Sequence, residues 1–162
     1  MDDVKLLKIL EKDPRISTKD LADILDETEN NVLEVKNRLE RDKVICGYHT
    51  VINWDKTNCD RVQAIIEVSA KTERDKGYDD VAMRIARFPE VKSLYLMSGK
   101  NEFMVLIDGK TMREIADFVG QKLAPLEGVM STVTCFVLKQ YKIEGVVIDE
   151  DRFEDQRQIV TP

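Results

Sequence analysis

The sequence has few of the residues that metal centres and nucleophilic catalysis need. It contains one histidine, His49, and three cysteines, Cys46, Cys59 and Cys135. None of them stands at metal-ligand spacing, and the chain has no nucleophile–base pair and no glycine-rich phosphate loop. We therefore expect no metal, no cofactor and no catalytic residue, and we assign His49 no role.

Long hydrophobic runs are also missing. The longest uncharged apolar segments are strand-sized, well short of the roughly 20 residues that cross a bilayer. We expect no secretory or transit signal at the start of the chain. Cysteines without a pairing pattern are typical of a reducing compartment. These features predict a cytoplasmic protein with reduced thiols and no membrane partner.

Positive charge is scarce as well. The chain has 25 Lys and Arg against 31 Asp and Glu, a formal net charge of −6. Non-specific attraction to polyanions is therefore not a default property. Apolar and charged residues are abundant, at 43% and 35% of 162 residues. This composition is enough for one domain or two small ones with real cores.

Two short helices are predicted near the start of the chain. Residues 3–12 carry apolar side chains at helical spacing, and Pro14 ends that helix. Ser17, with Asp20 three residues later, is an expected N-cap for a second helix that includes residues 21–25.

A third helix is expected in TENNVLEVKNRLERDK, residues 28–43, where Val32, Val35 and Leu39 form one buried stripe. The following VICGYHTVINW, residues 44–54, is rich in β-branched and aromatic residues and predicts a strand or hairpin. Three helices and a β-ribbon are the layout of a winged helix-turn-helix domain, here residues 1–54. Three-helix bundles of other functions share these helix lengths.

The pattern changes after the polar stretch DKTNCD, which lies in a predicted hinge at residues 55–61. Thr111 and Glu114 form a capping box that opens a helix. The order strand, helix, strand, strand, helix, strand is the ferredoxin-like βαββαβ unit, so we expect an α+β protein with this domain at residues 62–142. The elements are expected at residues 62–70, 78–88, 91–99, 102–109, 111–123 and 128–141.

Both faces of the predicted sheet carry apolar residues. One alternating set holds Ala64, Ile66, Val68, Phe103, Val105, Ile107, Val133 and Val137. The intervening set holds Ile65, Leu94, Leu96, Met104, Leu106, Phe136 and Leu138. Two helices cover only one face, and a bare apolar sheet exceeds what monomers normally expose. We expect a second copy to cover it and form a homodimer, with a companion domain as the alternative cover.

The end of the chain, residues 143–162, is predicted to be an acidic tail. It holds six acids between Glu144 and Asp155, with one arginine among them. Such a run is typical of a solvated segment. The RQIV segment, residues 157–160, is able to add one edge strand.

Three motifs occur in order: R-I-S-x-x-x-L-A at 15–22, R-L-E-x-x-x-V-I-x-G-Y at 38–48 and G-V-x-x-T-x-T-x-x-V-L at 128–138. Through them the chain, from residue 3 to about 142, resembles the Lrp/AsnC (feast/famine) family of bacterial and archaeal transcription regulators. The resemblance implies an N-terminal winged helix-turn-helix that binds double-stranded DNA. It also implies a C-terminal ferredoxin-like domain, called RAM, that dimerises through its sheet and often assembles into octamers. An amino acid or similar small effector between subunits is implied as well.

The outer face of the third helix supplies candidate DNA contacts. Asn pairs well with adenine, Arg with guanine, and Glu accepts a hydrogen bond from cytosine, while lysines hold phosphates. The same mixture of side chains is also ordinary solvated helix surface. The candidates for base edges are Asn30, Asn31, Glu34, Asn37, Arg38 and Arg41, and those for phosphates are Lys19, Lys36 and Lys43.

Residues 1–50 hold nine Lys and Arg against twelve Asp and Glu. Since phosphate neutralisation drives non-specific affinity, one copy of this domain should bind DNA poorly. Two or more copies at a fixed spacing gain affinity through effective concentration. We therefore expect a dimer, or an octamer, to supply the affinity for DNA that the charge of the third helix does not provide.

A candidate effector site lies in the segment MSGKNE, residues 97–102, where the family typically has glycine followed by aspartates. Gly99 allows a turn with exposed N–H groups. Lys100 replaces the first aspartate, which favours an acidic effector or no effector, and Glu102 matches the second. Asn101, with Thr132 and Thr134 from the last strand, completes the set. Glycine turns in hairpins and threonines in strands are equally usual without a ligand.

Two other functions fit the layout. One is a ligand-sensing or interaction module that has lost DNA binding, which the acidic third helix would suit. The other is an enzyme, because some relatives of this layout decarboxylate tetrapyrroles. Such chemistry would need histidines or arginines around a large pocket, and the one histidine lies in the predicted wing.

Overall fold

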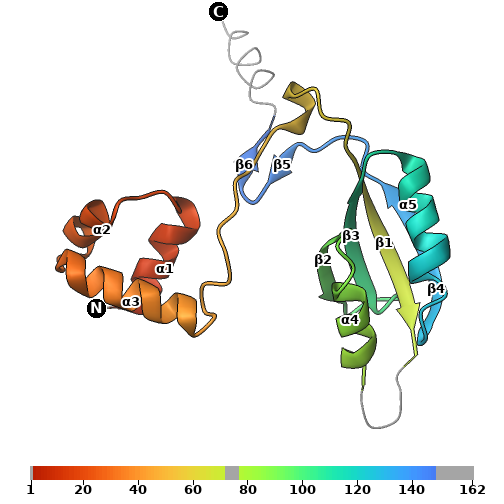
Figure 1. The fold of residues 1–162 in the computed structure, drawn as a ribbon, viewed down its shortest axis with the longest axis horizontal. Coiled ribbons are helices and arrows are strands. Elements are labelled where there is room, and N and C mark those ends of the chain that lie inside the picture. The colour runs from red at the N-terminus through yellow and green to blue at the C-terminus, as the bar shows by residue number, and fades with distance from the viewer. Residues whose placement is uncertain (1, 72–76, 149–162) are drawn as a thin grey trace, which may run out of the picture. The chain divides into compact units, whose positions relative to one another are not determined.

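The computed structural model describes residues 2–71 and 77–148 and divides the chain into two compact units, Met1–Val51 and Ile52–Pro162 (Figure 1). The predicted end of the first domain, residue 54, therefore lies three residues inside the second unit. No helix within the described ranges has both the length and the apolar character of a membrane span.

The first unit consists of α1 (Asp3–Lys12), α2 (Thr18–Leu25) and α3 (Glu29–Arg41). Each helix begins at a side-chain cap, and Ser17 accepts a hydrogen bond from the backbone N–H of Asp20 at 3.1 Å, as predicted. Asp26 ends α2 in the left-handed conformation with φ 55°, which turns the chain into α3. The apolar stripes of the helices meet in one small core. It contains Leu6, Leu10, Leu21, Ala22, Val32 and Leu39.

The predicted strand or hairpin at residues 44–54 is wrong: the structure has no strand in this segment. Tyr48 instead folds back onto α3, where its hydroxyl donates to Glu40 Oε1 at 2.7 Å. The Lys36 ammonium lies 5.3 Å from the centre of the Tyr48 ring. β-branched and aromatic residues favour strands only when a neighbouring strand takes up the backbone groups. Residues 2–51 contain no such neighbouring strand, and side-chain contacts of Tyr48 connect the segment to α3 instead.

The second unit has the predicted ferredoxin-like order. It contains β1 (Val62–Ala70), α4 (Asp79–Ala86), β2 (Val91–Leu96), β3 (Phe103–Gly109), α5 (Met112–Phe118) with a π-helical turn (Val119–Leu123), and β4 (Val129–Phe136). The strands form one antiparallel sheet in the order β2-β3-β1-β4. The predicted α+β fold is thereby confirmed, although β2 and β4 end earlier than predicted.

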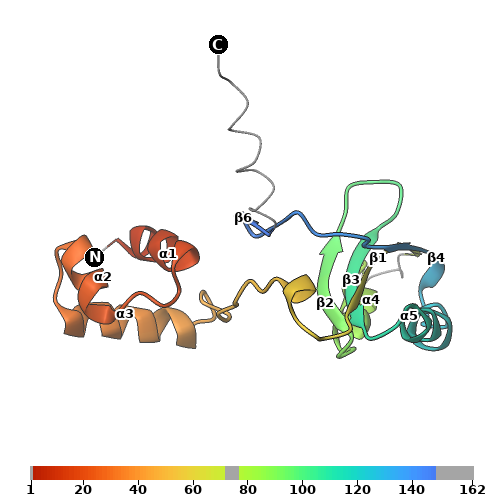
Figure 2. The same ribbon diagram turned by 90° about the horizontal axis from the view of Figure 1, so that it is seen from above.

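Both helices of this unit cover the same face of the sheet (Figure 2). Buried residues of β1 and β3 lie opposite one another in the register, for example Ile66 with Val105 and Val68 with Phe103. Val81, Ile85, Ile115, Phe118 and Leu123 pack on them from the helices and the π-helical turn. This core leaves the second face of the sheet, which we call the open face, without cover from α4 or α5.

The predicted division of residues between the two faces was partly wrong. Phe136 is paired with Ala64 and Leu94 with Val105, so both lie on the helix-covered face. Val133 is paired with Glu67 and lies on the open face. The residues placed on the wrong face were Leu94, Leu96, Phe136 and Val133. Alternation along one strand shows which of its residues share a face of the sheet. Which residues of different strands share a face depends on the register, and the register here shifts within β1 and β2.

The open face nevertheless remains apolar in its middle. Ile65, Met104 and Leu106 are half-buried, whereas Tyr95 and Val133 are 50% and 51% exposed. Bare side chains of this kind, side by side on four strands, are unusual for a monomer.

Sequence reasoning missed a hairpin after β4. Strands β5 (Lys142–Ile143) and β6 (Val146–Val147) are joined by Glu144 and Gly145, with φ of 46° and 82°. Two positive φ values in a two-residue loop are typical of a type I′ hairpin. The β-branched residues flanking Glu-Gly were the signal for it. The predicted edge strand at residues 157–160 lies outside the described residues.

Most of the predicted hinge is attached to the second unit. A short 3₁₀ helix (Trp54–Lys56) begins it, and the Arg61 guanidinium lies 5.0 Å from the Trp54 ring. Arg61 also donates to Asp108 Oδ2 at 2.6 Å. Just before it, the Asn53 side-chain amide donates to the carbonyl of Ile148 at 3.0 Å. These contacts hold both ends of the segment against the ferredoxin-like unit.

Candidate DNA-binding and effector sites

The exposed side of α3 carries most of the predicted DNA contacts. Asn30, Glu34, Asn37 and Arg41 follow one another at helical spacing and are all exposed. Glu34, Asn37, Arg38 and Arg41 line a shallow depression along this side together with Val35. The helix thus presents amide, carboxylate and guanidinium groups on one surface, opposite the stripe buried in the core.

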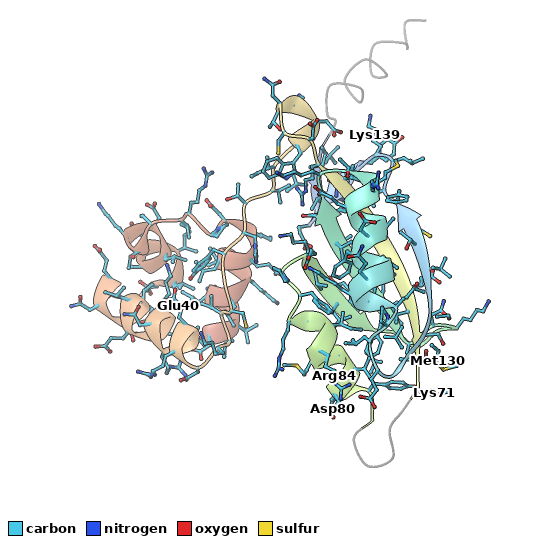
Figure 3. The ribbon with its side chains drawn as sticks, turned by 45° about the vertical axis from the view of Figure 1, so that its right-hand side comes forward. Glu40, Lys71, Asp80, Arg84, Met130 and Lys139 are labelled. Carbon is cyan, nitrogen blue, oxygen red and sulfur yellow. The ribbon has the colours of Figure 1, made fainter. Side chains whose placement is uncertain are left out.

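Two of the predicted contacts are held within the domain. The Asn31 amide donates to Glu27 Oε2 at 2.7 Å, and this hydrogen bond lowers the pKa of the Glu27 carboxyl group. Lys36 lies over the ring of Tyr48. The pKa of the Tyr48 hydroxyl is raised to about 12 by burial and by its hydrogen bond to Glu40. Glu40 is labelled in Figure 3. To contact DNA, Asn31 would have to break its hydrogen bond with Glu27, and Lys36 would have to leave the Tyr48 ring.

Arg38 is also engaged, with a residue of α1. Its Nη2 donates to Asp3 Oδ2 of α1 at 2.7 Å, forming an ion pair between side chains 45% and 36% exposed. Glu34, one turn earlier on α3, has neither a hydrogen bond nor an ion pair with any described residue. The contact of Arg38 with Asp3 therefore leaves a bare carboxylate on the exposed side of α3.

The remaining two cations lie at helix ends. Lys19 is exposed in the first turn of α2, and Lys43 is exposed just past the end of α3 with φ 59°. Exposed lysine side chains at helix ends can reach phosphate oxygens of the DNA backbone.

The loop between β2 and β3 contains four predicted effector residues. Gly99 and Lys100 are exposed at its tip. Asn101 donates to Glu67 Oε2 at 2.6 Å, and Glu102 Oε2 accepts from the backbone N–H of Ala70 at 2.8 Å. The latter hydrogen bond lowers the pKa of the Glu102 carboxyl group. Asn101 and Glu102 thus fix the loop to β1, and Gly99 and Lys100 remain for a ligand.

The two predicted threonines lie on β4, which is the strand on the other side of β1 from β3. Thr132 and Thr134 are paired with Val68 and Ile66 and share the helix-covered face. Strand β1 lies between their strand and β3, two strand spacings or roughly 10 Å away. Within one chain, strand β1 therefore separates the two threonines from the strand that follows the loop.

Sequence reasoning did not find the depression of about 280 Å³ between β3 and α5. Of its charged groups, Glu90 pairs with Lys122, which lowers the pKa of the Glu90 carboxyl group, and Asp108 pairs with Arg61. On α4, Arg84 (Figure 3) likewise contacts Glu127 at 3.4 Å. Within residues 2–71 and 77–148, no group of three or more His, Cys, Asp or Glu is arranged to hold a metal ion.

A helix-turn-helix unit with an exposed polar third helix, followed by a ferredoxin-like unit, defines a two-domain DNA-binding regulator. Residues 3–45 match the family model of a winged helix-turn-helix DNA-binding domain, and residues 63–147 match that of the Lrp/AsnC ligand binding domain. The chain belongs to the Lrp/AsnC family and is a DNA-binding transcription regulator. The predicted family and function are thereby confirmed, and the alternative of a module without DNA binding gains no support.

Individual relatives agree with this assignment. The chain is 39% identical over 161 residues to an uncharacterized HTH-type transcriptional regulator, YugG, of Bacillus subtilis, covering 99% of this chain and 96% of the relative. It is 29% identical to the HTH-type transcriptional regulator LrpA of Pyrococcus abyssi, covering 85% and 94%. Among solved structures it resembles regulator NMB0573 of Neisseria meningitidis, a complex with L-Met, at 25% identity and a TM-score of 0.68, covering 88% and 93%.

Proposed function

We propose that this regulator works in the cytoplasm as a homodimer, without enzymatic activity, and contacts double-stranded DNA with α3 of each copy. The observation that carries the proposal is the apolar open face of the sheet. Ile65, Met104, Leu106 and Val133 lie there beside Tyr95, and neither α4 nor α5 covers them. The first unit has a core of its own, so a second copy of the sheet is the simplest cover.

The charge of the DNA-binding unit makes pairing necessary for function. Its nine cations against twelve acids give a net charge near −3 in residues 1–50, so one α3 gains little from phosphate neutralisation. Two copies joined through their sheets place two such helices on one duplex, and the second contact then forms at a high effective concentration. Base edges would be contacted by Asn30, Glu34, Asn37 and Arg41, and phosphates by Lys19 and Lys43.

The isolated segment 1–54 is expected to bind operator DNA at least about 100-fold more weakly than the full chain, because it lacks the pairing surface. Titration of both proteins onto one labelled operator, recovered by selection with the full chain, measures the ratio. Far-ultraviolet circular dichroism of the segment checks that its three helices are intact. Equal affinities would show that the sheet is not needed for DNA binding.

We also propose a small-molecule effector at the loop of Gly99 and Lys100, completed by Thr132 and Thr134 of another subunit. The L-Met in the related Neisseria regulator supports an amino acid as the ligand class. Lys100 presents a cation at the exposed tip of the loop, which favours a ligand with an additional carboxylate. Assembly of dimers into octamers would supply further contacts between subunits.

Acidic amino acids are therefore expected to raise the thermal midpoint of the full chain more than neutral ones, since Lys100 pairs with the second carboxylate. The Lys100→Glu variant should lose this preference, whereas Lys110→Glu, on an exposed residue after β3, should keep it. Thermal unfolding with millimolar aspartate, glutamate, leucine and methionine provides the comparison. Identical shifts in Lys100→Glu and in the original chain would remove Lys100 from the site.

A further inference from the structure

We propose that Glu34 selects a cytosine in the operator and that Asp3 is the positioning residue that keeps Glu34 available for it. The inference rests on the proposed contact of α3 with DNA, and it goes further by giving one acidic residue the main discriminating role. It also explains why a DNA-contacting helix carries an uncompensated carboxylate.

The first step is the isolation of Glu34. A glutamate and an arginine four residues apart on a helix normally pair, and Arg38 stands in that position relative to Glu34. In this structure the Arg38 guanidinium instead donates to Asp3 Oδ2 at 2.7 Å. Asp3 belongs to α1, 35 residues away along the chain. Because Arg38 pairs with Asp3, Glu34 lacks the ion pair that this spacing normally allows.

The other cations of α3 are engaged too. Lys36 lies over the Tyr48 ring, and the Arg41 guanidinium is 3.5 Å from the carboxylate of its neighbour Asp42. No described residue donates a hydrogen bond to Glu34. A negative charge with no partner would face the phosphates of any duplex that α3 approaches, which weakens binding to every sequence.

A base can offset the repulsion between Glu34 and the phosphates by donating a hydrogen bond to the Glu34 carboxylate. In the major groove the exposed donors are the amino groups of cytosine and adenine. The adenine amino group stands beside the N7 acceptor, which repels a carboxylate and suits an amide such as Asn37 better. Glu34 therefore favours cytosine and penalises all other bases, which gives specificity by repulsion as well as by attraction.

The test uses the full chain and a library of duplexes with 20 random base pairs, followed by selection and sequencing. The unmodified protein should enrich a C·G pair at one position of each half-site. Glu34→Gln should lose that preference alone, a change of roughly 5- to 150-fold in discrimination at that position. Its affinity for a single duplex of arbitrary sequence should rise, because one repulsive charge is gone.

Glu29→Gln is the matched control, since Glu29 is an exposed acid of the same helix outside the proposed contact surface. It should raise affinity for the arbitrary duplex without changing any base preference. The role of Asp3 is separated by two variants. Asp3→Asn frees Arg38 to pair with Glu34 and should weaken the cytosine preference. Arg38→Gln breaks the same ion pair but leaves Glu34 bare, so the preference should persist.

Each alternative outcome decides a specific point. If Glu34→Gln enriches the same bases as the unmodified chain, the selection of cytosine by Glu34 is overturned while DNA binding stands. If Asp3→Asn and Arg38→Gln change base preference equally, the ion pair is merely structural and Asp3 has no positioning role. If the unmodified chain enriches no sequence at all, the proposed contact of α3 with DNA itself fails.

Discussion

Leu106→Arg is expected to convert the proposed dimer into a monomer and to weaken operator binding by about 100-fold or more. Leu106 lies in the middle of the open face, paired with Ile65 on one side and Ser93 on the other. Two arginines brought together across a symmetric interface would be desolvated without partners, a cost of several kcal/mol each. Sedimentation or light scattering at micromolar concentration measures the change in mass.

Met83→Arg is the matched control for this substitution. Met83 is 58% exposed on α4, on the helix-covered side of the sheet, so the same arginine is added away from the open face. This variant should remain dimeric and keep its affinity for DNA. Leu106 is not part of the core under the helices, so Leu106→Arg should retain the circular dichroism of the original chain. A stable dimer after Leu106→Arg, or a monomeric original chain, would contradict a dimer formed by this face.

The helices and the ferredoxin-like order were predictable because local patterns determine them. The stripe of Val32 and Leu39 is buried as its spacing predicts, and the caps at Ser17 and Thr111 form as their motifs indicate. The wing was not predictable from composition, since β-branched residues form a strand only beside a partner strand. Phe136 was assigned to the wrong face for a related reason, because register depends on pairing between distant strands.

The candidate site shows the same division. Helical spacing correctly placed Glu34, Asn37 and Arg41 on the exposed side of α3. The partners of these residues came only from the folded chain, because Asp3 is close to Arg38 in space and distant in sequence. The helical spacing of residues predicts which side of α3 a side chain lies on. Tertiary packing decides whether that side chain is already paired with another residue or is available to bind DNA.

Gly128→Ala is expected to destabilise the ferredoxin-like unit by roughly 3–5 kcal/mol. The residue has φ 92°, a conformation that side chains rarely adopt, and a β-carbon there would lie 2.6 Å from Val81 Cγ2. Val81 is a fully buried residue of α4, and a valine in a helix has one strongly preferred χ1 rotamer. Urea unfolding at one fixed protein concentration measures the loss, since the proposed dimerisation would make stability depend on concentration.

Substitutions at two other glycines distinguish backbone strain from the clash with Val81 as the cause of the lost stability. Gly145→Ala meets the same backbone strain at φ 82° but no atom within 4 Å, so it should cost only about 1–2 kcal/mol, and only in the small hairpin. Gly120→Ala has open space and no positive φ and should be neutral or slightly stabilising. Adding Val81→Ala to Gly128→Ala should remove the clash, so the double variant should be less destabilised than the sum of the two single changes. Strict additivity would show that strain of the backbone, rather than contact with α4, makes glycine necessary at this position.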